Sequence, residues 1–227
     1  MTLALIRGQL ETAATQQGIS ADKWKIYRDA CDARTVLGLR DRALAVLNAL
    51  LTFYPETELS DDENLVVFPS NAQLTARANG IAGTTLRENL ALLVDAGLIH
   101  RNDSPNGKRY ARKGRDGTIE TAYGFSLAPL LARAKELELL AQDVAEERRH
   151  LKILKERISL RRRDIRKLIS AAMEEGASGD WGMVESHYIA AVGRLSKAKS
   201  REDLSGCAEE LDLLQEEVVN LLELQLI

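Results

Sequence analysis

The stretch that decides the fold is PSNAQLTARANGIAGTTLRENLALLVDAGLIHRNDSPNGKRYARKGR, residues 69–115. It predicts two short helices joined by a tight turn and followed by a basic hairpin. Ser70 and Gln73 have the spacing of a capping box, so the first helix is expected to begin there. Leu74 lies on the apolar face of this helix, and Gly80 is a typical helix terminator.

The second helix is predicted within GTTLRENLALLVDAGLI, residues 83–99. Thr85 and Glu88 repeat the capping-box spacing, and Gly97 is expected to end the helix. The apolar residues at helical spacing are Leu86, Leu90 and Leu93. Two helices joined by about four residues that include a glycine are typical of a helix-turn-helix.

Polar side chains on these two helices are the candidate contacts to DNA bases. On the second helix, the expected recognition helix, they are Thr84, Thr85, Arg87 and Glu88; on the first helix they are Ser70, Asn71 and Gln73. An arginine can bind guanine through two hydrogen bonds, and a threonine methyl can contact thymine. Glu88 has two interpretations, as a capping residue or as an acceptor from a cytosine amine.

The segment after the recognition helix predicts a wing. Pro105-Asn106-Gly107 is a strong turn signal, and we expect two alternating strands to flank it as a hairpin. The candidate DNA contacts of the wing are Arg101, Lys108, Arg109, Arg112, Lys113 and Arg115. Such a hairpin would lie along a phosphate backbone, and a merely solvated surface hairpin is the alternative.

The remaining segments suggest a two-domain chain that is mainly α with a small β-hairpin. Residues 1–128 are expected to form the winged helix-turn-helix domain with an N-terminal helical extension. Its further predicted elements are an amphipathic segment at 1–20, a short helix within 21–40, a helix at 41–54, an acidic loop at 56–64, and strands at 65–68 and 118–127.

Residues 129–227 predict a long-helix, coiled-coil-like module. Apolar residues recur every seven positions along a helix of about 45 residues that starts near Pro129, and again in the last helix. These stripes are Leu130, Leu137, Val144, Leu151, Ile158 and Ile165, then Leu204, Leu211 and Val218, with Trp181, Val184 and Tyr188 on a middle helix. We expect the first and last helices to pair antiparallel within the chain, and pairing with a second copy as a homodimer is the alternative.

Charge in this module is divided between its helices. Eight acidic residues and one arginine lie in 201–227, whereas the long helix carries the basic run RRRDIRK. Arg161, Arg162 and Arg163 could therefore contact the acidic helix within the chain or contact DNA, and a solvated face is the third reading.

Composition excludes several other classes of protein. Aromatic residues make up only 4% of the chain, which weighs against a platform that stacks single-stranded bases. The two cysteines and three histidines have no metal-ligand spacing, so no metal or other cofactor is expected. We find no catalytic constellation and expect no enzyme. No apolar run of about 18 residues occurs, which predicts a cytoplasmic protein without a membrane partner.

Long runs of this chain resemble the RepC replication initiators of alphaproteobacterial repABC-type plasmids. They include DRALAVLNALLTFYPETEL, LVVFPSNAQLTARANGIAGTTLRENLALLVDAGLI, RNDSPNGKRYARKG, YGFSLAPLLARA, RRRDIRKLISAAMEEG and LLQEEVVNLLE. The resemblance implies a protein that binds double-stranded DNA at the plasmid origin, inside its own coding region, and starts plasmid replication, with host replication proteins as candidate partners. Family members usually continue further, so this chain is expected to be the N-terminal portion.

The residues themselves leave two binding functions open. A sequence-specific replication initiator and a winged-helix transcriptional repressor need the same recognition helix. Origin-dependent plasmid maintenance would separate them.

Overall fold

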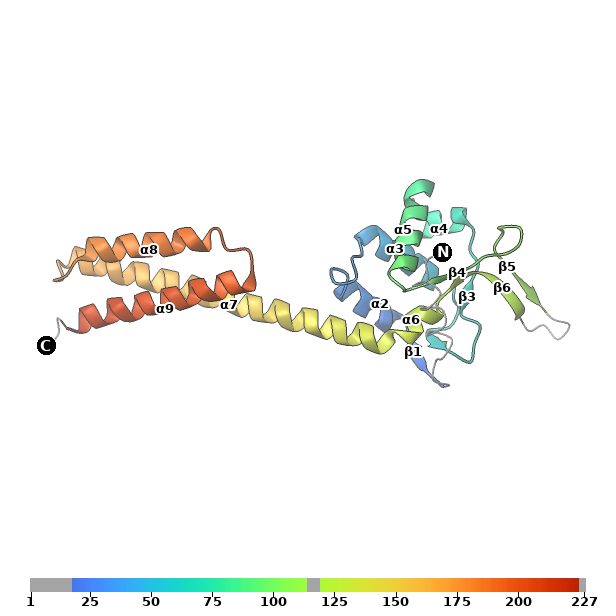
Figure 1. Cartoon of the computed structure of the whole chain (residues 1–227), viewed down its shortest axis with the longest axis horizontal. Coiled ribbons are helices and arrows are strands. Elements are labelled where there is room, and N and C mark those ends of the chain that lie inside the picture. The colour runs from blue at the N-terminus through green and yellow to red at the C-terminus, as the bar shows by residue number, and fades with distance from the viewer. Residues whose placement is uncertain (1–17, 114–118, 225–227) are drawn as a thin grey trace. The chain divides into compact units, whose positions relative to one another are not determined.

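The computed structural model describes residues 18–113 and 119–224, and these divide between Ala145 and Glu146 into two compact units. The described chain is mainly helical, with small antiparallel sheets in the first unit (Figure 1). This confirms the prediction of a mainly α fold with a small β component. Most of the amphipathic segment predicted at 1–20 lies outside the described residues.

The first unit is built around one buried helix. Its four early helices are α2 (Lys23–Asp32), α3 (Asp41–Leu51), α4 (Asn71–Arg77) and α5 (Gly83–Asp95). Helix α3 packs against α2, α4 and α5, and its buried residues are Ala43, Leu44, Val46, Leu47, Ala49, Leu50 and Leu51. Because α3 is apolar on nearly every side, it can only exist as the centre of a core.

The two helix starts predicted from capping boxes turned out differently. At α4 the box is confirmed, because the Ser70 Oγ accepts from the Gln73 N–H and the Gln73 Oε1 accepts from the Ser70 N–H. At α5 the prediction is wrong: the helix begins at Gly83, and Thr85 and Glu88 lie inside it. The same spacing occurs within any helix, since residues three apart share a face.

One long strand, β6 (Ile119–Ser126), organises the main sheet. Strands β3 (Val66–Val67) and β4 (His100–Asn102) pair with its C-terminal end, and β5 (Tyr110–Lys113) pairs with the rest, all antiparallel. The predicted strands at 65–68 and 118–127 are thereby confirmed. Position 124 of β6 must be a glycine because β3 approaches it closely: a Cβ there would lie 2.2 Å from the Val67 carbonyl oxygen.

The predicted hairpin around Pro105-Asn106-Gly107 is wrong in its pairing. A turn does form there: the Gly107 N–H donates to the Ser104 carbonyl at 3.1 Å, and Gly107 has a φ of 68°. However, β4 and β5 run in the same direction and both pair with β6, so the turn interrupts one edge of a longer hairpin. Turn residues report a local bend, but they do not say which strands pair.

The acidic stretch predicted as a loop at 56–64 contains a strand instead. Strand β2 (Glu58–Ser60) pairs antiparallel with β1 (Ser20–Asp22). Leu59 in the middle of β2 is completely buried, and its neighbour Glu58 is exposed. One buried leucine fixes this strand, which the surrounding acidic residues concealed in the sequence.

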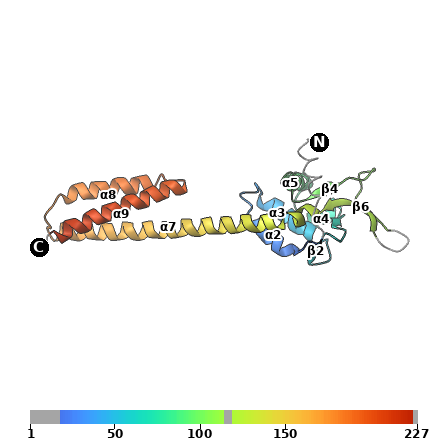
Figure 2. The ribbon, with the colours of Figure 1, turned by 60° about the horizontal axis from the view of Figure 1, so that its bottom comes forward.

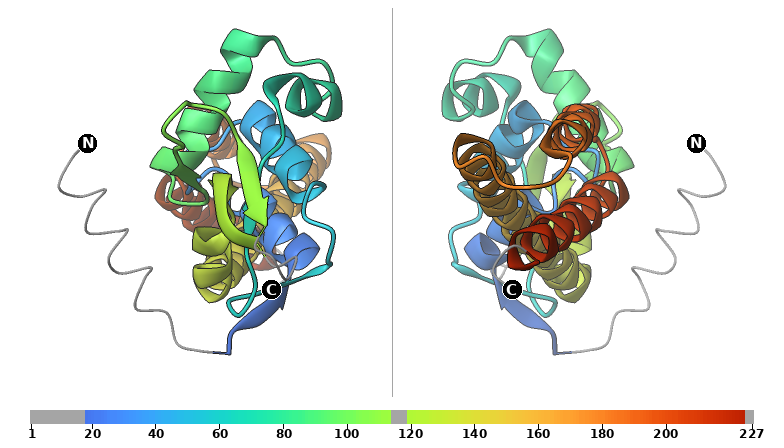
Figure 3. Two further views of the ribbon diagram at one scale, coloured as in Figure 1. Left: turned by 90° about the vertical axis from the view of Figure 1, so that its right-hand side faces the viewer. Right: turned by 90° about the vertical axis from the view of Figure 1, so that its left-hand side faces the viewer.

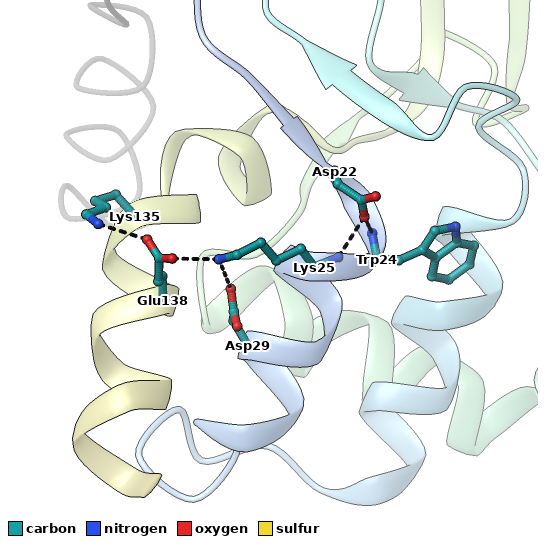
Figure 4. Close-up of polar contacts among 6 residues, drawn as sticks. All are labelled: Asp22, Trp24, Lys25, Asp29, Lys135 and Glu138. Atoms are coloured by element: carbon teal, nitrogen blue, oxygen red, sulfur yellow. Dashed lines mark hydrogen bonds and ion pairs between the residues drawn. The ribbon is translucent and has the colours of Figure 1, made fainter. Parts of the chain in front are cut away.

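The long helix predicted from Pro129 is divided at Arg133 into α6 (Ala128–Ala132) and α7 (Ala134–Glu174). The first turns of α7 belong to the core of the first unit, in which Leu137 is completely buried. Figure 4 shows the polar contact beside it: the Glu138 carboxylate binds the Lys25 ammonium at 2.8 Å and the Lys135 ammonium at 2.8 Å. Lys25 lies in α2, whose start is capped by the Asp22 side chain.

The second unit is a three-helix bundle formed by the later part of α7 with α8 (Trp181–Leu195) and α9 (Arg201–Glu223) (Figures 2 and 3). Its buried core consists of Ile158, Ile165, Ile169, Ala172, Trp181, Val184, Tyr188, Ala191, Ala208, Leu211, Leu214 and Val218. Most of these lie on the predicted apolar stripes. Val144 and Leu151, also on the α7 stripe, are only half-buried.

The predicted antiparallel pairing of the first and last helices is wrong in direction. Contacts between α7 and α9 join Glu147 to Arg201, and Arg161 to Gln215, so the residue numbers rise together along both helices. The two helices are therefore parallel. Helix α8 is the physical reason, because it reverses the chain once and a second turn then returns it to the direction of α7.

Burial in this bundle gives a first prediction. Ile158 is 3% exposed, so Ile158→Ala should lower the free energy of unfolding by about 2–4 kcal/mol through lost packing and a residual cavity. Leu160→Ala is the matched control, since Leu160 is 50% exposed on the same helix. Urea denaturation followed by circular dichroism measures both; equal losses would contradict the bundle core described above.

Candidate nucleic-acid interface

The first half of α5 presents a polar surface on a helix whose other side is fixed. Thr84, Arg87 and Glu88 are exposed, and Thr85 is half-buried. The opposite side of α5 is held in the core by Leu86, Leu90 and Leu93. Among the described residues, neither Arg87 nor Glu88 has an ion pair or a side-chain hydrogen bond, so both side chains can meet a ligand.

The connection between α4 and α5 is short and conformationally defined. Asn79 and Gly80 both have positive φ values, 58° and 73°, and the Gly80 N–H closes the end of α4 on the Thr75 carbonyl at 2.8 Å. Figure 3 shows α4 and α5 on either side of this turn. The turn therefore sets the angle at which α5 leaves α4.

Arg77 anchors α4 to the end of α3. Its guanidinium lies 3.7 Å from the Phe53 ring centroid and donates to the Thr52 carbonyl at 2.9 Å and to the Thr52 hydroxyl at 2.8 Å. Sequence reasoning missed this residue, because a basic residue at the end of a helix gives no sign of a partner 25 residues away.

The three candidates on the first helix have different roles in the structure. Ser70 and Gln73 are exposed but are engaged in the capping box that starts α4. Asn71 is exposed at the first position of α4. All three lie at the N-terminal end of the helix, where backbone N–H groups and the helix dipole favour an anion.

The candidate wing residues divide into exposed and internal side chains. Lys108 and Arg112 are exposed, and Arg101 is exposed with its Nε 2.6 Å from Asp103. Lys113 ends β5, and Arg115 lies outside the described residues. Within the part of the wing that the structure describes, Lys108 and Arg112 are therefore the cations that are exposed and make no ion pair.

Arg109 is half-buried, and its guanidinium binds other parts of the first unit. Its Nη1 donates to the Pro69 carbonyl at 2.8 Å, and its guanidinium lies 4.5 Å from the Phe125 ring centroid. Burial lowers the pKa of Arg109, as expected for a cation withdrawn from water. Arg109 therefore joins the segment before α4 to the sheet, a role that its place in a basic run did not reveal.

The basic cluster of the second unit is partly used within the chain. The Arg161 Nε binds Asp212 at 2.8 Å and its Nη1 binds Gln215 at 2.7 Å, and Arg157 also binds Asp212. For Arg161 the predicted intrachain contact is confirmed. Arg163 lies 3.2 Å from its neighbour Asp164, whereas Arg162 is half-buried and its Nε has no hydrogen-bond partner.

The part of the chain that the structure describes contains neither a candidate metal cluster nor a candidate membrane-spanning helix. Within residues 18–113 and 119–224, no three His, Cys, Asp or Glu residues are grouped so that they could hold a metal ion. No helix in the same residues is long and apolar enough to cross a membrane.

Comparison with known proteins identifies the family. The model of the replication protein C N-terminal domain matches residues 1–173. A protein of Rhizobium rhizogenes named "Putative replication protein C" is 54% identical over 225 residues, which cover 99% of this chain and 56% of that protein. A protein of the same name from Sinorhizobium fredii (strain NBRC 101917 / NGR234) is 51% identical over 226 residues, 100% of this chain and 56% of the relative.

The chain belongs to the replication protein C family, as its resemblance to RepC predicted. It spans little more than half the length of the curated relatives that it matches. No solved structure matches it.

The internal position of Arg109 gives a second prediction. Arg109→Ala removes a hydrogen bond to the Pro69 carbonyl and the contact with Phe125, so the free energy of unfolding should fall by about 1–3 kcal/mol. Arg112→Ala is the matched control, because Arg112 is exposed and should change it by less than about 0.5 kcal/mol. Thermal unfolding measures both variants, and equal unfolding midpoints for Arg109→Ala and Arg112→Ala would contradict a stabilising role for Arg109.

Proposed function

We propose that this chain binds double-stranded DNA sequence-specifically through a winged helix-turn-helix formed by α3, α4, α5 and the β5–β6 hairpin. The observation that carries the proposal is the polar first half of α5, with Arg87 and Glu88 exposed on a helix held rigidly by its other side. A recognition helix presents this end to base edges in the major groove.

Each exposed group has a chemical role in this proposal. Arg87 binds guanine through two hydrogen bonds, and the Thr84 and Thr85 methyl groups contact thymine. Lys108 and Arg112 bind phosphates beside the recognition site, which adds affinity that decreases with salt. Ser70 and Gln73 hold the start of α4 through their capping box, and the exposed Asn71 beside them can donate a hydrogen bond to a phosphate.

Membership of the replication protein C family supports a specific DNA target, the origin of a plasmid. We infer that the chain acts in the cytoplasm by binding this origin, without catalysing a reaction, and that plasmid replication starts from the complex. Recruitment of host replication proteins is part of the proposal. Because the chain spans about half of its relatives, initiation itself is a proposal for the longer protein.

Binding to tiled duplex fragments of the protein's own gene tests origin recognition. One fragment should be bound far more tightly than the rest, at the same salt concentration, and uniform weak binding would leave only a non-specific DNA-binding protein. A plasmid-maintenance assay then separates initiation from repression. An initiator is needed for the plasmid to persist, whereas a repressor changes only transcription.

A third prediction concerns base recognition. Arg87→Ala should weaken binding to the preferred fragment by about 1–3 kcal/mol and should leave random DNA nearly unaffected, as expected for a lost base contact. Arg28→Ala is a matched control, since Arg28 is an exposed arginine on α2 of the same unit. Equal losses on both DNAs would make Arg87 a phosphate contact only.

A fourth prediction concerns the wing. Replacing Lys108 and Arg112 together by alanine should weaken preferred and random DNA alike. The slope of log K against log salt should become shallower by about 1.8, or about 0.9 for each lost phosphate contact. Titrations over a range of salt measure this slope, and an unchanged slope would remove the hairpin from the interface.

A further inference from the structure

The part of α7 within the second unit carries a second concentration of positive charge. Ten lysines or arginines and only two acidic residues lie between residues 148 and 167. Six of these cations lie on two different flanks of the helix, because neighbouring residues of an α-helix are rotated by about 100°.

One flank is partly neutralised within the bundle. Arg157 and Arg161 both bind Asp212 of α9, and Arg161 also binds Gln215. This is the side of α7 that faces the acidic last helix. These contacts give both arginines partners within the chain, and Asp212 offsets one of their two charges.

The other flank keeps its charge. Lys152, Lys155, Ser159, Arg162 and Arg166 follow one another at spacings of three and four residues, which places them within an arc of about 80°. We call these five residues the α7 stripe. Lys152, Lys155, Ser159 and Arg166 are exposed. The nearest charge compensation is weak, since Lys152 lies 3.9 Å from the exposed Glu156.

The neighbouring helix does not neutralise the stripe. Helix α8 runs beside it, because the Tyr188 hydroxyl donates to the Arg162 carbonyl at 3.2 Å. This helix has a single acidic residue, Glu185, and among the described residues Glu185 makes no ion pair. The buried Nε of Arg162 likewise has no hydrogen-bond partner.

The dimensions and chemistry of the stripe suit a nucleic-acid backbone. From Lys152 to Arg166 the helix rises about 21 Å, which is long enough to contact several phosphates of a duplex. The small Ser159 at its centre allows a phosphate to approach the helix and can donate a hydrogen bond. The five residues of the stripe include no large apolar side chain, which a protein interface or a membrane-surface helix would need at its centre. The exposed Leu160 lies beside the stripe, so pairing with a second copy of the chain is the competing outcome that the experiment must test.

We propose that the α7 stripe is a second, sequence-independent contact for the phosphate backbone of duplex DNA, separate from the winged region. The proposal rests on the proposed function only in taking duplex DNA as the polyanion. The stripe adds affinity for DNA of any sequence, and the winged region adds discrimination between sequences.

Charge-matched variants of the full chain test the proposal. Lys155→Gln with Arg166→Gln removes two charges from the stripe, and Lys197→Gln with Lys199→Gln removes two from the exposed connection between α8 and α9. On a long random-sequence duplex, the stripe variant should make the slope of log K against log salt shallower by about 1.8, whereas the control should leave it unchanged. Lys155→Gln alone should change the slope by about 0.9.

The outcomes separate this inference from the proposed function. Wild-type binding with equal slopes for wild type and stripe variant overturns the stripe and leaves the winged region intact. A wild-type chain that binds no duplex at all overturns both. A slope changed by the stripe variant but not by the wing variant supports the stripe and removes the wing. If light scattering shows a dimer that the stripe variant dissociates without changing the slope, the stripe binds a second copy and the proposal is wrong.

Discussion

Burial of α3 is the constraint on which the first unit depends. Seven of its eleven residues are buried, so the helix is stable only when α2, α4 and α5 surround it. This requirement fixes the apolar side of α5 and thereby decides which of its residues remain in water. The exposed position of Arg87 is thus a consequence of packing on the other side of the helix, and Arg77 strengthens the arrangement by tying α4 to Thr52.

Features that depend on residues three or four positions apart could be predicted from the sequence. The capping box of Ser70 and Gln73 and the apolar stripe through Ile158 and Ile165 are of this kind, and so is the outward position of Arg87. Such patterns need only the geometry of one helix. The start of α5 shows their limit, because the spacing of Thr85 and Glu88 is equally compatible with the middle of a helix.

Features that depend on distant partners could not be predicted. The Pro105-Asn106-Gly107 turn was recognised, but the partner of both flanking strands is β6, which only the three-dimensional sheet reveals. Arg109 was placed with the exposed wing cations, although its guanidinium binds the Pro69 carbonyl, 40 residues earlier in the chain. A basic run in a sequence predicts positive charge, but the fold decides which of its members face solvent.

In the second unit, too, the fold decides which basic side chains face solvent. Asp212 of α9 lies beside Arg157 and Arg161 and offsets part of the charge of that flank. The net charge of −3 therefore does not show how charge is distributed in this unit. The acidic last helix contacts one side of the basic run, and the cations of the α7 stripe lie on the other side. The availability of this stripe for a polyanion is therefore decided by which side of α7 contacts α9, and not by the number of basic residues.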